Sequence, residues 1–188
     1  ARHNQLGGPV LRLKDARGCI ATRHLRPVNL PKGLTGLLIH SNAYISLRFT
    51  KNFHKIAPKL EHKKNRYGDN VFAITSVAEN EGKSTCAANI AVSLADRGNK
   101  VMLLDLDFKK PALYKIFSEE ETENGELSEL LRKNITFEDF DFRQFKKTSL
   151  SLAVNTKADP EYRSLIENGS VFALIEKLKT IYDFVIID

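Results

Sequence analysis

The apolar positions of this chain change their spacing near residue 70. From there on, compact apolar runs of strand length occupy residues 71–74, 101–107, 149–154 and 182–187. Between these runs, apolar residues recur at helical spacing over residues 83–97, 126–133, 137–142 and 161–180, with a break near Asn168-Gly169. Strands that alternate with helices predict an α/β fold in which a mainly parallel sheet carries helices on both faces.

The chain before residue 71 follows a different pattern. Apolar residues recur at roughly helical spacing over residues 41–60, with Lys and Arg between them, which predicts a helix. Residues 1–38 show no clear period and are interrupted by glycine and proline, so we expect irregular structure there. The expected organisation is therefore a basic irregular extension over residues 1–40 and an α/β domain over residues 41–188.

Charge divides the chain near the same place. Residues 1–70 hold fourteen Lys and Arg against three Asp and Glu, whereas residues 71–188 hold fifteen against twenty. A basic segment contacts anionic lipid, nucleic acid or an acidic partner, or it forms a solvated extension. Because the charges are spread out without interleaved aromatic residues, the solvated extension is favoured and no nucleic-acid partner is expected. The five histidines lack the close spacing of metal ligands.

Composition indicates the cellular compartment in which the protein is expected. No apolar run approaches the length of about 18 residues that a membrane span needs, and the start of the chain lacks the apolar core of a secretory signal. Two cysteines are too few for a disulfide framework, so a reducing, cytoplasmic compartment is expected. The chain begins with Ala1, which is consistent with a fragment or a processed form.

A candidate phosphate-binding loop lies between the first strand and the helix that follows. The nucleotide-binding positions expected in it are Asn80, Glu81, Gly82, Lys83, Ser84 and Thr85. Backbone N–H groups at a helix start favour phosphate, Lys would reach the outer phosphates, and the Ser84 hydroxyl would bind Mg²⁺. The full P-loop pattern has glycine at the position of Val77, and the alternative is that Ser84 or Thr85 simply caps the helix.

Carboxylates follow two other predicted strands. Asp105 and Asp107 end the run at 101–107 and, two residues apart in a strand, would share one face. Ligands of open α/β sheets lie at the carboxyl ends of strands, so the pair would face a Mg²⁺–phosphate group, with one carboxylate available as a base. Asp188 ends the last apolar run and is a further candidate Mg²⁺ ligand. The alternatives are solvent-facing strand ends and a strand cap.

Taken together, these segments resemble the bacterial tyrosine kinases of capsular and exopolysaccharide synthesis, which are P-loop proteins related to the MinD/ParA ATPases. The segments that carry the resemblance, over about residues 41–188, are Ile74-Thr75-Ser76, Glu81 to Thr85, Asn89-Ile90-Ala91, Leu104 to Pro111 and Asp183 to Asp188. In that family, Glu81 to Thr85 belongs to the Walker A motif, Leu104 to Pro111 contains the Walker A′ motif, and Asp183 to Asp188 corresponds to the Walker B motif. MinD and ParA proteins usually have a lysine at the position of Ala78, whose absence favours the kinases.

The resemblance implies an ATP–Mg²⁺-dependent protein-tyrosine autokinase. It implies catalytic roles for Lys83, Asp105 and Asp107, with Asp105 as the base, and Mg²⁺ contacts for Ser84, Asp107 and Asp188. It further implies a protein at the inner face of the cell membrane, with a membrane-anchored activator or polysaccharide co-polymerase as partner and with self-association. The alternative is a MinD/ParA-like nucleotide-binding ATPase or a non-catalytic interaction module.

Two departures from that family bear on activity. Its members continue beyond the Walker B strand to a tyrosine-rich tail, so we expect this chain to be truncated after that strand, incomplete at its C-terminus, and inactive if the truncation is real. The tyrosines present are scattered, which favours packing or surface roles over phosphate acceptance: Tyr44, Tyr67, Tyr114, Tyr162 and Tyr182.

Overall fold

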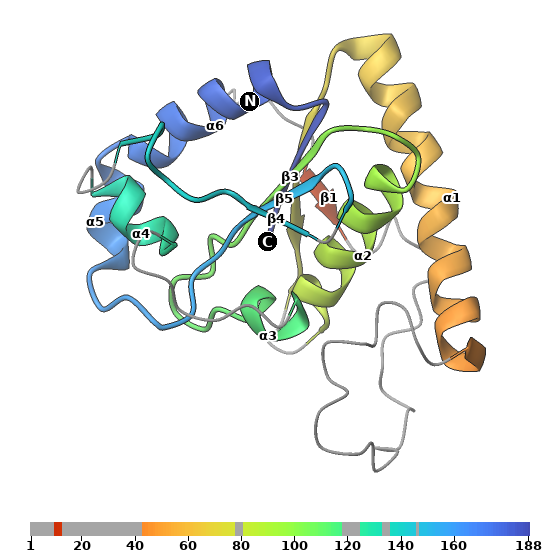
Figure 1. The fold of residues 1–188 in the computed structure, drawn as a ribbon, viewed down its shortest axis with the longest axis horizontal. Coiled ribbons are helices and arrows are strands. Elements are labelled where there is room, and N and C mark those ends of the chain that lie inside the picture. Colours follow the sequence, from red (N-terminus) through yellow and green to blue (C-terminus); the bar gives the residue numbers. More distant parts are fainter. Residues whose placement is uncertain (1–9, 13–42, 78–80, 118–124, 133–135, 146) are drawn as a thin grey trace.

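A computed structural model describes the chain in six segments: residues 10–12, 43–77, 81–117, 125–132, 136–145 and 147–188, with side chains described from Phe53 onward. One sheet of six strands, in the order β1-β2-β6-β3-β5-β4, runs through it (Figure 1). Every neighbouring pair is parallel except β4 and β5. The strands are β1 (Val10–Arg12), β2 (Val71–Thr75), β3 (Val101–Leu104), β4 (Arg143–Gln144), β5 (Leu150–Ala153) and β6 (Phe184–Ile187).

Helices cover both faces of this sheet (Figure 1). They are α1 (Ala43–Tyr67), α2 (Lys83–Ala95), α3 (Leu113–Phe117), α4 (Leu127–Leu131), α5 (Tyr162–Glu167) and α6 (Ser170–Ile181). The helices α1 and α2 pack together on one side, and α4, α5 and α6 pack together on the other. The predicted α/β fold with a mainly parallel, doubly covered sheet is confirmed.

The strands divide their side chains between two hydrophobic clusters, because successive residues of a strand point to opposite faces. In β3, Leu103 belongs to the cluster under α1 and α2, whereas Met102 belongs to the cluster under α4, α5 and α6. In β6, Phe184 belongs to the cluster under α1 and α2, and Val185 belongs to the cluster under α4, α5 and α6. All four side chains are fully buried, as expected for a parallel sheet that is covered on both faces.

The middle of the sheet determines where the loops meet. β6 lies between β2 and β3, with Val185 opposite Val71 and also opposite Met102. Because all three strands are parallel, their carboxyl ends lie side by side at one edge. The loops that follow β2 and β3 therefore meet the end of β6.

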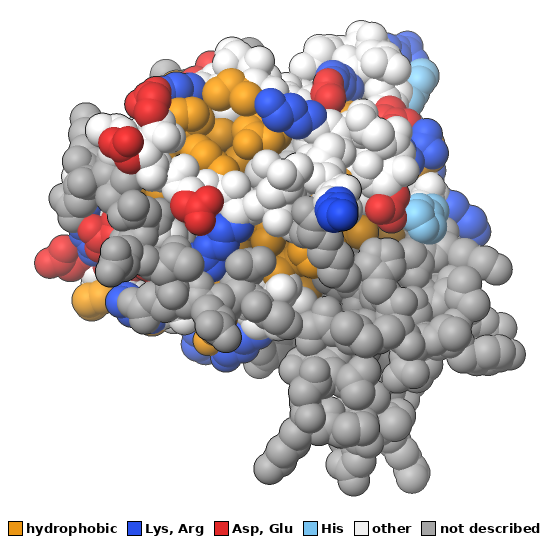
Figure 2. Space-filling view, viewed as in Figure 1, with side chains coloured by type: hydrophobic (Ala, Val, Ile, Leu, Met, Phe, Trp, Pro, Cys, Tyr) orange, Lys and Arg blue, Asp and Glu red, His pale blue; other side chains and the backbone are white. Residues whose placement is uncertain are grey.

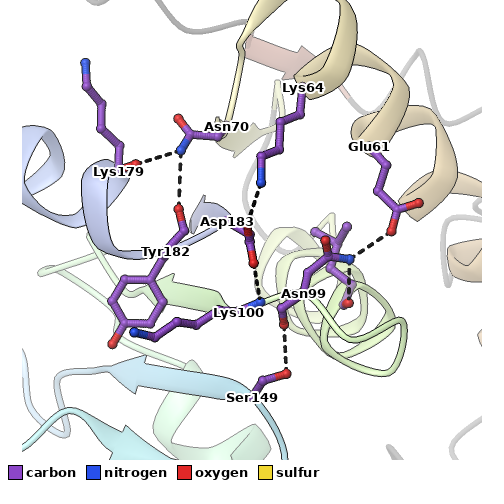
Figure 3. Close-up of polar contacts among 10 residues, drawn as sticks. Glu61, Lys64, Asn70, Asn99, Lys100, Ser149, Lys179, Tyr182 and Asp183 are labelled. Atoms are coloured by element: carbon purple, nitrogen blue, oxygen red, sulfur yellow. Dashed lines mark hydrogen bonds and ion pairs between the residues drawn. The ribbon is translucent and has the colours of Figure 1, made fainter.

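α1 is attached to the rest of the domain through one face and through polar contacts at its carboxyl end. Phe53, Ala57 and Leu60 are buried in the cluster shared with α2. Beyond them, Lys64 Nζ lies 2.6 Å from Asp183 Oδ1, and the other Asp183 oxygen accepts the Lys100 N–H at 2.9 Å (Figure 3). This polar group lies at the amino ends of the strands, away from the loops described above.

The outer face of α1 is basic. Its exposed residues at helical spacing are Lys55, Lys59, His62, Lys63 and Arg66. Figure 2 shows basic and histidine side chains along the edge occupied by α1, and apolar side chains gathered on the same view beside α6. None of the described helices is both long and apolar enough to cross a bilayer.

Most predicted elements are present, with some differences. The helix predicted over 41–60 extends to Tyr67, and the break at Asn168-Gly169 separates α5 from α6. The short helix predicted over 137–142 is wrong, because that segment forms turns in which Phe140 packs edge-on against Phe142, 4.8 Å between ring centroids. The pattern did not predict β1, α3 or β4, each five residues or shorter. β1 places three residues of the expected irregular extension in the sheet.

The domain boundary near residue 40 stays a prediction, because residues 13–42 lie outside the described segments. What the structure adds is that α1 shares a hydrophobic cluster with α2 and the sheet. We therefore treat α1 as part of the domain.

If α1 folds with the sheet, Leu60→Ala will lower the free energy of unfolding by about 2–5 kcal/mol, because a buried side chain leaves a cavity. Leu60 is 2% exposed, whereas His62, two residues further along the same helix, is exposed. His62→Ala is the matched control and should change stability by less than about 0.5 kcal/mol. Equal urea midpoints for the two variants would show that α1 is not part of the cooperative unit.

Candidate functional site

The loop after β2 leads directly into α2 through a left-handed glycine. Gly82 has φ 84° and ψ 27° and precedes the first helical residue, Lys83. A side chain there would meet no atom within 4 Å, so glycine is required by the positive φ and not by space. The Gly82 carbonyl accepts the Cys86 N–H at 2.9 Å, which starts the helical bonding pattern.

No side chain caps the start of α2. The alternative that Ser84 or Thr85 is the N-cap is therefore wrong, since both lie within the helix and the N-cap residue is Gly82. The first N–H groups of a helix have no intrahelical partner, and with the helix dipole they favour an anion. The helix start thus has the properties expected of a phosphate site.

The first part of the same loop has an unusual residue. Val77 occupies the position at which a strict P-loop has glycine, and its side chain is 93% exposed. Its N–H donates to the Glu81 carboxylate at 3.1 Å. A side chain at this position is tolerated because it points into solvent. Asn80, predicted to bind nucleotide, lies outside the described residues, as do Ala78 and Glu79.

The two carboxylates after β3 differ in their environments. β3 ends at Leu104, so Asp105 and Asp107 lie in the following loop, and the expectation that they share one face of a strand is wrong. Asp105 is completely buried, and its two oxygens accept N–H groups of Asp107 at 3.2 Å and Leu113 at 3.4 Å. Asp107 is half-buried and accepts the Lys110 N–H at 3.0 Å.

Burial changes the acidity of Asp105. It raises the pKa of Asp105 to about 8, with a further contribution from the charge of Asp188 and a smaller one from Asp107; the two backbone N–H groups act in the opposite direction. The alternative of a solvent-facing strand end is therefore excluded for Asp105. Because nearby carboxylates repel one another unless a cation or proton lies between them, the arrangement calls for positive charge.

Asp188 provides the third carboxylate. Both of its side-chain oxygens are buried and have no hydrogen-bond partner among the described residues within 3.5 Å. Burial raises the pKa of Asp188, and the charge of Asp107 adds to this; the Ser84 hydroxyl, which is near but does not meet hydrogen-bond geometry, and the Lys83 ammonium lower it. The structure therefore brings together five of the predicted residues: Lys83, Ser84, Asp105, Asp107 and Asp188.

These residues fit a hydrated cation bound to phosphate. Two buried carboxylate oxygens without a partner are costly unless a ligand satisfies them. Among the described residues, no group of three or more His, Cys, Asp or Glu is arranged to hold a metal by itself. Mg²⁺ commonly keeps several waters and binds through one or two protein oxygens plus substrate phosphates, so this arrangement suits it.

The sequence patterns did not identify the residues that hold the loop after β3. Asn155 is buried; its amide donates to the Asp105 carbonyl at 3.0 Å, and its oxygen accepts the Ser128 N–H at 3.1 Å. Asp159 donates its N–H to the Phe108 carbonyl at 2.8 Å and pairs with Arg132 at 2.6 Å. Both residues follow β5 at its carboxyl end. The same position, after the carboxyl end of a strand, led to the prediction of Asp105 and Asp188.

Known proteins are similar to this chain to different extents. The tyrosine-protein kinase CpsD of Streptococcus agalactiae is 34% identical over 118 residues, which are 63% of this chain and 51% of the relative. The chain thus spans about half the length of the curated relatives it matches. A solved chimeric protein, CapA2B2, superposes with a TM-score of 0.67 at 30% identity over 82% of this chain and 66% of the other.

A second group of relatives is the MinD proteins. The septum site-determining protein MinD of Pyrococcus horikoshii, solved with Mg-ADP, has a TM-score of 0.54 at 27% identity. The similarity covers 63% of this chain and 48% of that one. Residues 72–181 match the family model described as the CobQ/CobB/MinD/ParA nucleotide binding domain. With the P-loop, the sheet order and the carboxylates in place, the chain is a member of the CobQ/CobB/MinD/ParA nucleotide-binding family, and it is similar to the bacterial tyrosine kinases within it.

Proposed function

We propose that this chain is the nucleotide-binding part of an ATP–Mg²⁺-dependent protein-tyrosine autokinase. The observation that carries the proposal is the meeting of Lys83 and Ser84, at the start of α2, with Asp188 at the end of β6. Asp105, whose acidity responds to the charge of Asp188, completes the group. A cationic helix start beside buried carboxylates suits a phosphate chain and its divalent cation.

In this proposal each residue has a separate task. Bound nucleotide and Mg²⁺ supply the phosphoryl group and the positive charge. The Lys83 ammonium would bind the outer phosphate oxygens, and the N–H groups after Gly82 would hold the inner ones. The Ser84 hydroxyl, Asp107 and Asp188 would hold Mg²⁺ directly or through water. Phosphoryl transfer depends mainly on such positioning and charge compensation.

Asp105 is the proposed base, and its acidity limits when it can act. With a pKa of about 8 it is mostly protonated at neutral pH, and the protonated form cannot accept a proton from a substrate hydroxyl. Positive charge in the site would favour the ionised form by offsetting the charge of Asp188. Asp105 would thus act as a base only when nucleotide and Mg²⁺ occupy the site. Without them, little proton abstraction would occur.

The relatives named as tyrosine kinases support a proposal for the biological setting. We propose a role in capsular or exopolysaccharide synthesis and export, at the inner face of the membrane. The proposed partner is a membrane-anchored activator or polysaccharide co-polymerase, with self-association and without nucleic acid.

The similarity to MinD supports a second candidate, a nucleotide-binding ATPase or a non-catalytic interaction module. Both candidates use the same phosphate loop and differ in the acceptor of the phosphoryl group. Phosphotyrosine formed with ATP–Mg²⁺ favours the kinase. Free phosphate without phosphotyrosine favours the ATPase, and binding without either product favours the interaction module.

The first test is Lys83→Met with ATP–Mg²⁺ binding measured by calorimetry. The variant should bind about 10- to 100-fold more weakly, because a hydrogen bond to a charged group contributes about 1.5–3 kcal/mol. Lys59→Met, on the exposed face of α1, is the matched control and should bind as the unmodified chain does. Equal affinity of all three proteins, or no binding by any, would refute the proposal.

A second test concerns the stability of the folded chain against pH. The Asp105 pKa rises from 3.8 to about 8 on folding, so the folded state binds this proton more tightly and stability falls as pH rises between these values. Asp105→Asn removes this contribution to the pH dependence of the free energy of unfolding, which is up to about 1.4 kcal/mol per pH unit. The variant should therefore gain stability relative to the unmodified chain as pH rises from 5 to about 8.

Urea unfolding at several pH values measures this difference. Asp139→Asn, at an exposed position, is the control and should leave the pH dependence unchanged. Parallel curves for Asp105→Asn and the unmodified chain would mean that Asp105 is ionised in the folded state, contrary to the protonation assigned above.

A further inference from the structure

Tyr162, the first residue of α5, is held between two cations from different segments. Arg163 Nε donates to the Tyr162 hydroxyl at 3.3 Å. Lys109, from the loop after β3, places its ammonium 5.1 Å from the centre of the Tyr162 ring. The ring is half-buried, whereas both cations are exposed, so the hydroxyl lies at a positively charged part of the surface.

This tyrosine is linked to the loop that carries two of the candidate site residues. Lys109 is two residues beyond Asp107 in the same loop. That loop is joined to the segment before α5, because the Asp159 N–H donates to the Phe108 carbonyl at 2.8 Å. The Asp159 carboxylate in turn accepts the Glu161 N–H at 2.8 Å. Tyr162 is therefore connected through short hydrogen bonds to the loop that carries Asp105 and Asp107.

Among the described residues, the two acids closest to Tyr162 in the sequence pair with a cation other than Lys109 or Arg163. The neighbouring carboxylate of Asp159 pairs with Arg132 at 2.6 Å, and that of Glu161 lies 3.6 Å from the same guanidinium. Hydrogen bonding to Arg163, with a further contribution from Lys109, lowers the pKa of Tyr162. Tyr67, Tyr114 and Tyr182 also have a cation near the ring, but at Tyr162 a cation donates to the hydroxyl itself.

We propose that Tyr162 is a phosphate-accepting residue and that Lys109 and Arg163 form the site that holds its phosphate. The proposal rests on the proposed function, since the donor is a nucleoside triphosphate bound by a copy of this chain. The Tyr162 oxygen forms a bond to the γ-phosphorus, and the bond from that phosphorus to the β–γ bridging oxygen breaks. The phenolic proton leaves to solvent through a base, and a nucleoside diphosphate is released.

The chemistry of phosphate explains why two cations are needed. A phosphotyrosine carries a charge of about −1.5 to −2 at pH 7 and three strong acceptor oxygens. Arg binds phosphate with a planar pair of donors, and Lys binds it as a point charge. With Lys109 in the loop after β3 and Arg163 on α5, the phosphate would join these two segments.

The first experiment asks whether transfer occurs. The full chain is incubated with ATP and Mg²⁺, and phosphopeptides are mapped by mass spectrometry alongside Lys83→Met, Tyr162→Phe and the exposed-tyrosine control Tyr67→Phe. We expect phosphate at Tyr162 in the unmodified chain and in Tyr67→Phe, with at least a tenfold loss in Lys83→Met. Nucleotide binding without phosphate at Tyr162 would overturn the inference while leaving nucleotide binding by the chain intact.

The second experiment tests the phosphate site independently of kinase activity. The full chain is produced with phosphotyrosine at position 162, and the phosphate is titrated by ³¹P NMR. The second phosphate pKa, near 6 in a free peptide, should fall by about one pH unit beside two cations. It should return to the peptide value in Lys109→Ala/Arg163→Ala and stay low in the matched control Arg66→Ala/Lys115→Ala.

The two experiments separate the possible failures. A peptide-like titration of the unmodified sequence would overturn the phosphate site, whatever the enzyme activity. Absence of ATP binding in the first experiment would instead refute the proposed function, and with it self-transfer to Tyr162. Phosphorylation of Tyr162 together with a lowered phosphate pKa would support the whole inference.

Discussion

Burial of two carboxylates at adjoining strand ends is the constraint on which this structure depends. The side-chain oxygens of Asp105 and Asp188 are held out of water at the ends of their strands, and the charge of Asp188 raises the cost of ionising Asp105. Such an arrangement is stable only with protons, a cation or hydrogen-bond donors nearby. Lys83 and Ser84 favour the ionised form of Asp188, so the cationic start of α2 contributes to the same charge balance.

The surrounding structure keeps this group in place. Asn155 joins the Asp105 backbone to the start of α4, and Asp159 holds the Phe108 backbone. Both residues follow β5, so the third loop at this sheet edge supports the loop that carries the carboxylates. The hydrophobic clusters on the two faces of the sheet fix the strand ends from which all three loops begin.

The sequence allowed much of this to be predicted, for identifiable reasons. Buried parallel strands are continuous apolar runs, and polar residues at their carboxyl ends stand out, which is how Asp105 and Asp188 were found. The end of β3 was misplaced because Leu106 is apolar and continues the apolar run, whereas the strand itself ends at Leu104. Asn155 was missed, although it follows β5 at its carboxyl end, because a single amide in a loop does not by itself indicate a phosphate or metal site. The residues 137–142 were misassigned because contacts among aromatic rings, made only in the folded state, override local spacing.

The central position of β6 also has a consequence for the order of folding. β2 and β3 are not neighbours, and both pair with a strand that is roughly 110 residues beyond β2 along the chain. During synthesis, β3 and β5 can pair early, but β2 has no parallel neighbour on its inner side until β6 is made and inserted. Such long-range pairing is slow, because a large loop must close before its contacts form. The phosphate loop and its carboxylates therefore come together late, and a partly synthesised chain has a folded half-sheet without a nucleotide site.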